Sequence, residues 1–178
     1  MRPLEGQVAL VTGASRGVGK GVAEGLAHAG ATVVAVARTA TASTFSAPLV
    51  AVDCDLTDDA AVMALFQQTQ TAHGHVDVLV NAAWGGYERM VENGRFTFGD
   101  PFWEQPAWRW DAMMTAGVRS AYVASQHAAR LMVPRRRGLI VNISFWPAQK
   151  FIANTPYGVS KAATDKLTAD MAHELAPH

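Results

Sequence analysis

Short apolar runs alternate with amphipathic stretches along most of the chain. Each run is apolar at nearly every position, which is typical of a strand buried on both faces of a parallel sheet. Five runs predict strands, at residues 8–11, 32–37, 48–54, 76–80 and 139–143. Four stretches carry apolar residues at helical spacing and predict helices, at residues 20–29, 58–72, 111–132 and 160–175.

This alternation predicts an α/β fold, because a parallel sheet needs crossover helices, which cover both of its faces. Right-handed crossovers then give a three-layer, doubly wound, Rossmann-like sheet. The chain contains no repeat, linker or low-complexity tail, so we expect residues 1–178 to form one domain. Residues 39–47 join two predicted strands without a clear helical pattern.

The segment 84–110 breaks this rhythm, because it is much longer than the loops that usually join a strand to a helix. Its aromatic content argues against disorder. The aromatic residues are Trp84, Tyr87, Phe96, Phe98, Phe102, Trp103, Trp108 and Trp110. They favour either a site for an apolar substrate or ordinary packing in a core or subunit interface, and the sequence leaves both open.

Charge and composition argue against several classes of function. A formal net charge of +0 over 178 residues gives no reason to expect binding to nucleic acid or to an anionic membrane. Cys54 is the only cysteine, so no internal disulfide can form, and a reducing compartment is expected. No apolar stretch is long enough to cross a bilayer, and the histidines lack metal-ligand spacing. We therefore expect a cytoplasmic protein without a metal site.

A glycine-rich turn follows the first predicted strand and precedes the first predicted helix. Glycines suit such a turn because the chain bends sharply and a ligand must approach the backbone closely. The free N–H groups and the dipole at the start of the helix favour negative charge there. We predict that the pyrophosphate of a dinucleotide rests on this turn, which comprises Gly13, Ser15, Arg16, Gly17, Val18 and Gly19.

Tyr157 and Lys161 lie four residues apart near the start of the last predicted helix. This spacing puts both side chains on one helix face, one turn apart. A lysine ammonium held near a phenol favours the ionised phenolate. The pair can then act as a general acid in a reduction and as a general base in an oxidation.

The glycine spacing, with Thr12 before Gly13, and the Tyr157–Lys161 pair together resemble the short-chain dehydrogenase/reductase family. The resemblance runs from Gly6 to the end of the chain. It implies an oxidoreductase that transfers a hydride between a nicotinamide cofactor and a carbonyl or alcohol substrate. It also implies that Lys161 binds the nicotinamide ribose.

The end of the second predicted strand carries Arg38, and no Asp or Glu occupies that position. An acidic residue there would bind a ribose 2′-hydroxyl, whereas an arginine can pair with a 2′-phosphate. Arg16 adds a second cation in the glycine turn. These two arginines favour NADP(H) over NAD(H).

The resemblance assigns further cofactor contacts after the third and fourth strands. It gives Asp55 and Leu56 to the adenine, although Asp55 equally suits an acid that orders the turn before the next helix. Asn81 and Ala82 would lie behind the cofactor, where the family pattern Asn-Asn-Ala-Gly reads Asn-Ala-Ala-Trp in this chain. The tryptophan of that string is Trp84.

Two catalytic positions of the family are altered in this chain. The family's substrate-orienting serine is matched by Ser144 when counted back from Tyr157, but by Phe145 when aligned on the strand. We assign Ser144, which equally suits a serine that only satisfies backbone groups at a strand end. The family's helix asparagine, which organises a water behind the lysine, is matched by Gly117. One branch of the family also has this glycine and a long aromatic insert.

Members of the family normally continue with further strands beyond the residue that matches His178. Strand 139–143 is therefore expected to be a sheet edge with an apolar face, and edges of this kind favour association. We expect a homo-oligomer that acts on a small, apolar carbonyl or alcohol substrate, with no nucleic-acid or membrane partner. The alternative is a catalytically impaired or inactive dinucleotide-binding or interaction protein.

Overall fold

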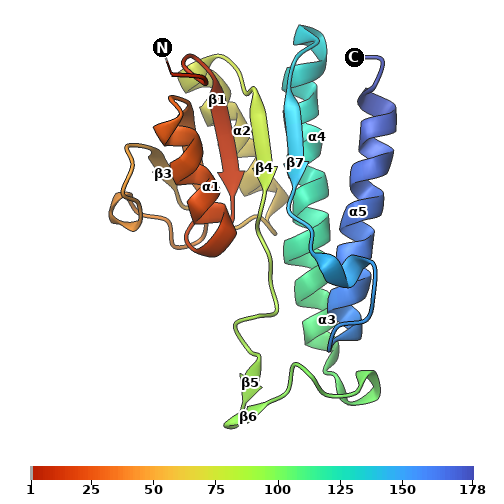
Figure 1. The fold of residues 1–178 in the computed structure, drawn as a ribbon. Helices are drawn as coiled ribbons and strands as arrows, with labels where there is room; N and C mark the ends of the chain where they lie inside the picture. The colour runs from red at the N-terminus through yellow and green to blue at the C-terminus, as the bar shows by residue number, and fades with distance from the viewer. Residues whose placement is uncertain (1) are drawn as a thin grey trace.

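The computed structural model describes residues 2–178, which form a parallel sheet with helices on both faces (Figure 1). The strand order is β3-β2-β1-β4-β7. The bounds are Val8–Thr12 for β1, Thr32–Val36 for β2, Val50–Val52 for β3, Val78–Asn81 for β4 and Leu139–Asn142 for β7. All five predicted strands are therefore present, and the predicted doubly wound α/β fold is confirmed. The strand expected at 48–54 is shortened to three residues in β3.

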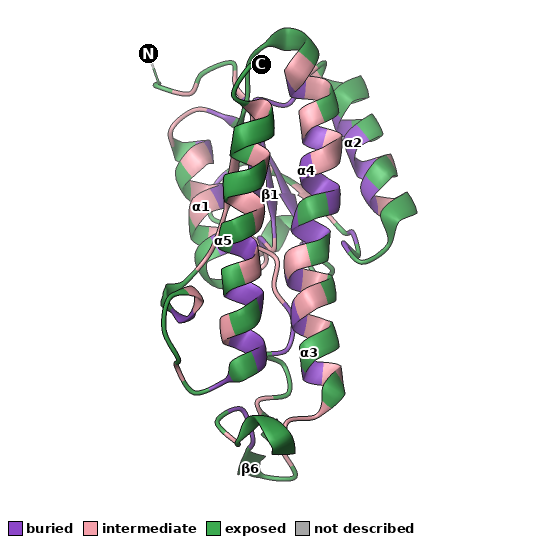
Figure 2. Ribbon diagram, turned by 90° about the vertical axis from the view of Figure 1, so that its right-hand side faces the viewer, coloured by how far each residue is buried: buried purple, intermediate pink, exposed green. Residues whose placement is uncertain are grey.

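The helices cover the two faces unequally. Their bounds are Gly17–His28 for α1, Asp59–His73 for α2, Ala107–Met113 for α3, Ser120–Met132 for α4 and Thr155–Leu175 for α5. One core cluster joins α1 to the sheet, and a second joins α2 and α4 to the opposite face. Helix α5 runs alongside the column formed by α3 and α4, and its buried residues gather in its first half (Figure 2).

A side-chain cap fixes the start of α2 and the start of α5. Helix α2 is capped by Asp58, whose carboxylate accepts hydrogen bonds from the N–H groups of Ala60 and Ala61. Helix α5 begins at Thr155, five residues before the expected start. Its cap is Asn154, whose side-chain oxygen accepts a hydrogen bond from the Tyr157 N–H at 2.9 Å. Tyr157 is therefore held rigidly in the first turn of a helix.

The long helix expected at 111–132 is a continuous column that contains a π-helical segment, Met114–Arg119. The wider turn leaves carbonyl groups with altered partners. The Ser120 hydroxyl donates to two of them, the carbonyl of Ala116 at 2.7 Å and that of Gly117 at 3.3 Å. Gly117 is buried within this segment.

The segment after β4 is ordered, as its aromatic content predicts. It forms a small antiparallel hairpin, β5 (Val91–Glu92) and β6 (Arg95–Phe96), and then a short 3₁₀ turn. This segment, residues 84–106, projects from the carboxyl ends of the strands to the foot of α3 and is called the insert below (Figure 1). Arg109 of α3 is fully buried and donates hydrogen bonds to the carbonyls of Arg89 and Thr97.

Strand β7 pairs only with β4 in the part of the chain that is described. The face of β7 that carries Leu139, Val141 and Ile143 lines a shallow apolar groove with residues of α1. The expected sheet edge at 139–143 is therefore observed. No helix within residues 2–178 has the length and apolar character needed to cross a membrane.

Candidate functional site

A large cavity opens beyond the carboxyl ends of the sheet strands. Its volume is ≈ 1350 Å³, and it lies where the crossovers from β1 and β4 diverge to opposite faces. In open α/β sheets, ligands bind at this switch point. The cavity is lined by every residue predicted for the site except Asn81. The fold therefore gathers segments from the glycine turn, four loops and α5 around one space.

The glycine turn leaves no room for a side chain at Gly13 or at Gly19. Gly13 has φ of +66°, and a Cβ atom at this position would lie 2.6 Å from the carbonyl oxygen of Ala82. A Cβ atom on Gly19 would lie 2.3 Å from the carbonyl oxygen of Gly13. Helix α1 has no side-chain hydrogen bond at its N-cap, Arg16, so its first N–H groups need other partners. Such a turn is suited to an anionic group.

The loop after β4 is held against this turn by Thr12. Its hydroxyl accepts hydrogen bonds from the N–H groups of Ala82 at 3.1 Å and Ala83 at 3.3 Å. Asn81 points the other way, because its side-chain amide donates to Asn142 at 2.9 Å and to Ser125 at 3.0 Å. Asn81 thus links β4 to β7 and α4, and it does not line the cavity.

The far end of the cavity carries the two arginines. Arg16 and Arg38 both line it, and the guanidinium of Arg38 is mostly exposed, 3.9 Å from the Glu88 carboxylate. Asp55 lines the same end and accepts hydrogen bonds from the Thr57 N–H at 3.0 Å and hydroxyl at 2.8 Å. These bonds hold the pKa of Asp55 below its usual value. Asp55 therefore orders the turn before α2, and it remains available to the cavity.

Tyr157 and Lys161 lie at the opposite end, on one face of α5, and both are buried to more than nine-tenths. The Lys161 ammonium donates to the Ile143 carbonyl at 3.1 Å and lies 3.4 Å from the centre of the Trp84 ring. Burial lowers the pKa of Lys161 from 10.5 to about 8, and the nearby Asp165 carboxylate opposes this shift. Ser144 lines the same end, and its hydroxyl finds no partner within residues 2–178.

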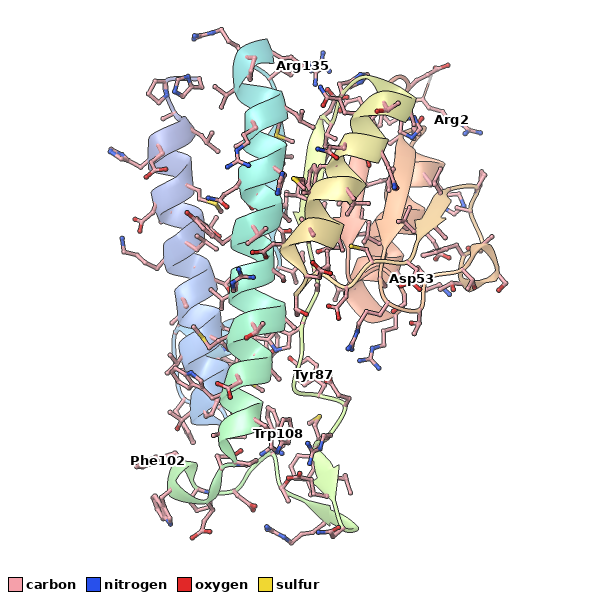
Figure 3. The ribbon with its side chains drawn as sticks, turned by 180° about the vertical axis from the view of Figure 1, so that it is seen from behind. Arg2, Asp53, Tyr87, Phe102, Trp108 and Arg135 are labelled. Atoms are coloured by element: carbon pink, nitrogen blue, oxygen red, sulfur yellow. The ribbon has the colours of Figure 1, made fainter. Side chains whose placement is uncertain are left out.

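Three aromatic residues that the motifs do not identify surround the Tyr157 ring. The ring centres of Trp84, Tyr87 and Phe98 lie 6.0, 5.8 and 5.9 Å from that of Tyr157, all in edge-to-face arrangements. Tyr87 lies where the chain leaves the sheet for the insert (Figure 3). Burial, with the adjacent Tyr157 phenol, raises the pKa of Tyr87. The aromatic content of the insert was the only sequence signal for this wall.

Burial of Lys161 should make the stability of the fold depend on pH. The folded-state pKa of Lys161 is about 8, below its usual 10.5, so the unfolded chain binds more protons between these values. Stability therefore rises with pH across this window, and the whole cost of burying the ammonium is present below pH 8. We expect Lys161→Met to stabilise the fold by about 1–2 kcal/mol at pH 7, after allowing for the lost hydrogen bond.

Urea unfolding of both proteins at pH 7 and at a pH well above 10.5 checks this expectation. The difference between the variant and the wild type should shrink towards the higher pH, because the folded and unfolded states then carry the same neutral amine. A difference that stays constant across this range would contradict the account. Lys166→Met, on the exposed side of the same helix, is the matched control.

Comparison with known proteins gives consistent results. A family model described as short chain dehydrogenase matches residues 7–178. The human protein "Dehydrogenase/reductase SDR family member 1" is 43% identical over 185 residues, which cover 99% of this chain. The chain spans 58% of that protein's length.

Solved structures of similar fold include enzymes with bound nucleotides. A metagenomic short-chain oxidoreductase in complex with NADP has a TM-score of 0.84 and 32% identity, and the match covers 98% of this chain and 79% of that one. A 7α-hydroxysteroid dehydrogenase complexed with NADH and 7-oxo glycochenodeoxycholic acid has a TM-score of 0.82 and 31% identity, covering 98% and 67%.

Proposed function

Because the chain belongs to the short-chain dehydrogenase family, we propose that it is an NADP(H)-dependent oxidoreductase that interconverts a carbonyl compound and an alcohol. The observation that carries this proposal is the single cavity that brings the glycine turn and the Tyr157–Lys161 pair together. The proposal also treats residues 1–178 as one nucleotide-binding domain. It is tested by NADPH oxidation with a panel of quinones, diketones and aldehydes.

The residues around the cavity fit a dinucleotide. The glycine turn would hold the pyrophosphate on the free N–H groups at the start of α1, and Gly13 and Gly19 allow the tight backbone packing that shapes this turn. Arg16 and Arg38 would face the 2′-phosphate, and Lys161 the nicotinamide ribose. The nicotinamide supplies the hydride when it is bound. Asp55, Leu56 and Ala82 would contact the rest of the nucleotide.

The chain's own groups supply the proton. The Tyr157 hydroxyl would donate its proton to the carbonyl oxygen of the substrate in the direction of reduction. The Lys161 ammonium, one turn away on α5, would stabilise the phenolate that remains. The Ser144 hydroxyl has no partner within residues 2–178, so it is free to donate a hydrogen bond to the same carbonyl oxygen. In the direction of oxidation, the phenolate takes the proton back.

The aromatic wall suggests the class of substrate. Trp84 and Tyr87 line the cavity beside Tyr157, and Phe98 packs against the Tyr157 ring outside the cavity lining. The two lining rings favour an apolar or aromatic carbonyl compound over a small polar one. The apolar groove along β7 is a surface on which a second copy of the chain would pack in a homo-oligomer.

Replacement of Arg38 tests the proposed preference for NADP(H). We expect Arg38→Ser to weaken NADPH binding by roughly 10- to 100-fold, because one charge-assisted pair with the 2′-phosphate is lost. The affinity for NADH, which has no such phosphate, should change by less than about twofold. Fluorescence titrations with both nucleotides provide the measurement.

The matched control is Arg130→Ser, on the exposed face of α4 and outside the cavity lining. It should leave both affinities unchanged. Equal affinities of the wild type for NADPH and NADH, or an equal loss of both in Arg38→Ser, would refute the role given to Arg38.

A further inference from the structure

Trp84 occupies an unusual position in the candidate site. It belongs to the loop after β4, and its ring lies between Lys161 on α5 and Gly117 in the π-helical segment. The Lys161 Nζ atom is 3.4 Å from the ring centre, close to the shortest separation that an ammonium and an aromatic face allow. The same ring meets Tyr157 edge-on, at 6.0 Å and 75°.

The Trp84 ring packs directly against the backbone of Gly117. A Cβ atom at position 117 would lie 2.6 Å from Cζ3 and 2.7 Å from Cε3 of Trp84. These distances are far inside van der Waals contact, so any side chain at 117 would displace the indole. The two residues are 33 positions apart in the sequence. The indole of Trp84 fits in this position only because residue 117 has no side chain.

The polar end of the indole does not explain its position. The Nε1–H group of Trp84 is buried and has no hydrogen-bond partner in the described part of the chain. An unpaired buried donor destabilises a fold, and buried tryptophans usually avoid this cost. The contact that the indole does make is between its face and the ammonium.

We propose that Trp84 is the positioning residue of Lys161: its ring face holds the ammonium at the cavity wall, and Gly117 supplies the space for the ring. This inference rests on the proposed function in giving Lys161 a role towards Tyr157. An ammonium has three N–H donors, and the Ile143 carbonyl accepts one of them at 3.1 Å. The electron-rich face of the indole stabilises the ammonium from a second side without supplying a competing negative charge.

Few charged or titratable groups face this ammonium. Asp165 lies on the same helix, one turn further on, and favours the charged form. Tyr157 also lies on α5, with its ring centre 5.9 Å from the Lys161 Nζ atom. Tyr87 from the insert and Asp111 from α3 line the same cavity. Burial is the largest influence on the pKa of Lys161, and it lowers this pKa by disfavouring the charged form. The ring face of Trp84 acts in the opposite direction, because it stabilises the ammonium.

The decisive experiment is a pH titration of the Lys161 side chain by ¹⁵Nζ NMR, assigned with Lys161→Met. Trp84→Phe keeps an aromatic face, whereas Trp84→Leu keeps only apolar bulk of similar size. We expect the pKa of Lys161 to be lower in the leucine variant than in the phenylalanine variant by roughly half a unit to one unit. Trp103→Leu, at a position that is 71% exposed, is the control and should not move it.

Equal pKa values of Lys161 in the two Trp84 variants would overturn the proposal. The pH profile of kcat with NADPH should shift with the same ordering. The NMR titration needs neither cofactor nor turnover. It therefore tests the role of Trp84 separately from the proposed oxidoreductase function. A shifted titration without any activity would refute the proposed function and leave the role of Trp84 intact.

Gly117 provides an independent test of the same pair. Gly117→Ala should lower Tm in the wild-type background, because the new methyl group displaces the indole. In the Trp84→Leu background the same change should be neutral or raise Tm, because alanine favours a helix over glycine. The same loss of Tm in both backgrounds would show that Gly117 does not act through Trp84 and would overturn that half of the proposal.

Discussion

The Tyr157→Phe variant is expected to lose about 10²–10⁴-fold in kcat, because its phenyl ring keeps the packing of the site but has no proton to donate. The ring is held by Trp84, Tyr87 and Phe98, and none of these contacts needs the hydroxyl to keep its edge-to-face geometry. NADPH affinity should stay within about threefold of the wild type, because the nucleotide is held chiefly by the glycine turn and the arginines. Steady-state kinetics and a fluorescence titration measure the two quantities.

Tyr122→Phe is the matched control. It removes a hydroxyl from the exposed face of α4, where its one hydrogen-bond partner within residues 2–178 is the Gln126 side chain. It should leave kcat unchanged. A Tyr157→Phe variant with near wild-type kcat would contradict the mechanism. A wild type that binds NADPH tightly but reduces no carbonyl compound would favour the non-catalytic alternative instead.

The second large effect is expected at Arg109, which we predict holds the insert in place. Its guanidinium is 0% exposed, and it donates hydrogen bonds to the Thr97 carbonyl at 3.1 Å and to the Arg89 carbonyl at 2.9 Å. It also donates to the Gln105 side chain and lies 3.6 Å from the Glu92 carboxylate. One side chain thus ties four separate points of the insert to α3.

Arg109→Met fills similar space but removes the hydrogen bonds to the Thr97 and Arg89 carbonyls and to the Gln105 side chain, and it takes the buried cation away from the Glu92 carboxylate. We expect the insert to open with a loss of about 3–5 kcal/mol in local stability. Hydrogen exchange of the insert amides should accelerate by at least about 100-fold, which corresponds to the lower end of this loss. The amides of β1 and β4 should keep their protection, because they lie in the sheet. KM for an apolar carbonyl compound should rise as Phe98 loses its fixed position beside Tyr157.

Arg95→Met is the control within the same insert. Arg95 makes two 2.7 Å hydrogen bonds to Asp100, but it is exposed, so water replaces these bonds at little cost. Slow exchange of the insert amides in Arg109→Met would show that the insert is held by its other contacts.

The fold follows from local pattern, because each strand is a short apolar run that must be covered on both sides. The glycine turn and the Tyr157–Lys161 pair are also visible in the sequence, since their chemistry depends on spacings of a few residues. The start of α5 was less visible. Pro156 argues against extending the predicted helix towards the N-terminus in the sequence. In the structure, this proline lies in the first turn of α5, a position that proline suits, and the helix is capped by Asn154.

The rest of the site depends on tertiary contacts. Nothing near Trp84 in the sequence indicates that its ring lies against Gly117 or under the Lys161 ammonium. Arg109 looks like an ordinary helix arginine until the insert folds over it. Asn81 ends a strand at the edge of the site, yet its amide turns towards α4 and β7, because Ser125 and Asn142 accept its hydrogen bonds there. These side-chain contacts join segments that are distant in the chain, so local sequence patterns do not predict them.

Tryptophan-sensitised fluorescence of NADPH tests the central claim most directly. The claim is that a nicotinamide lies beside Tyr157 and Lys161, where Trp84 lines the cavity. Excitation of tryptophan should then produce emission from the bound dihydronicotinamide that saturates with added NADPH and disappears with excess NADP⁺. The absence of saturable sensitised emission, or a signal that survives excess NADP⁺, would contradict the account.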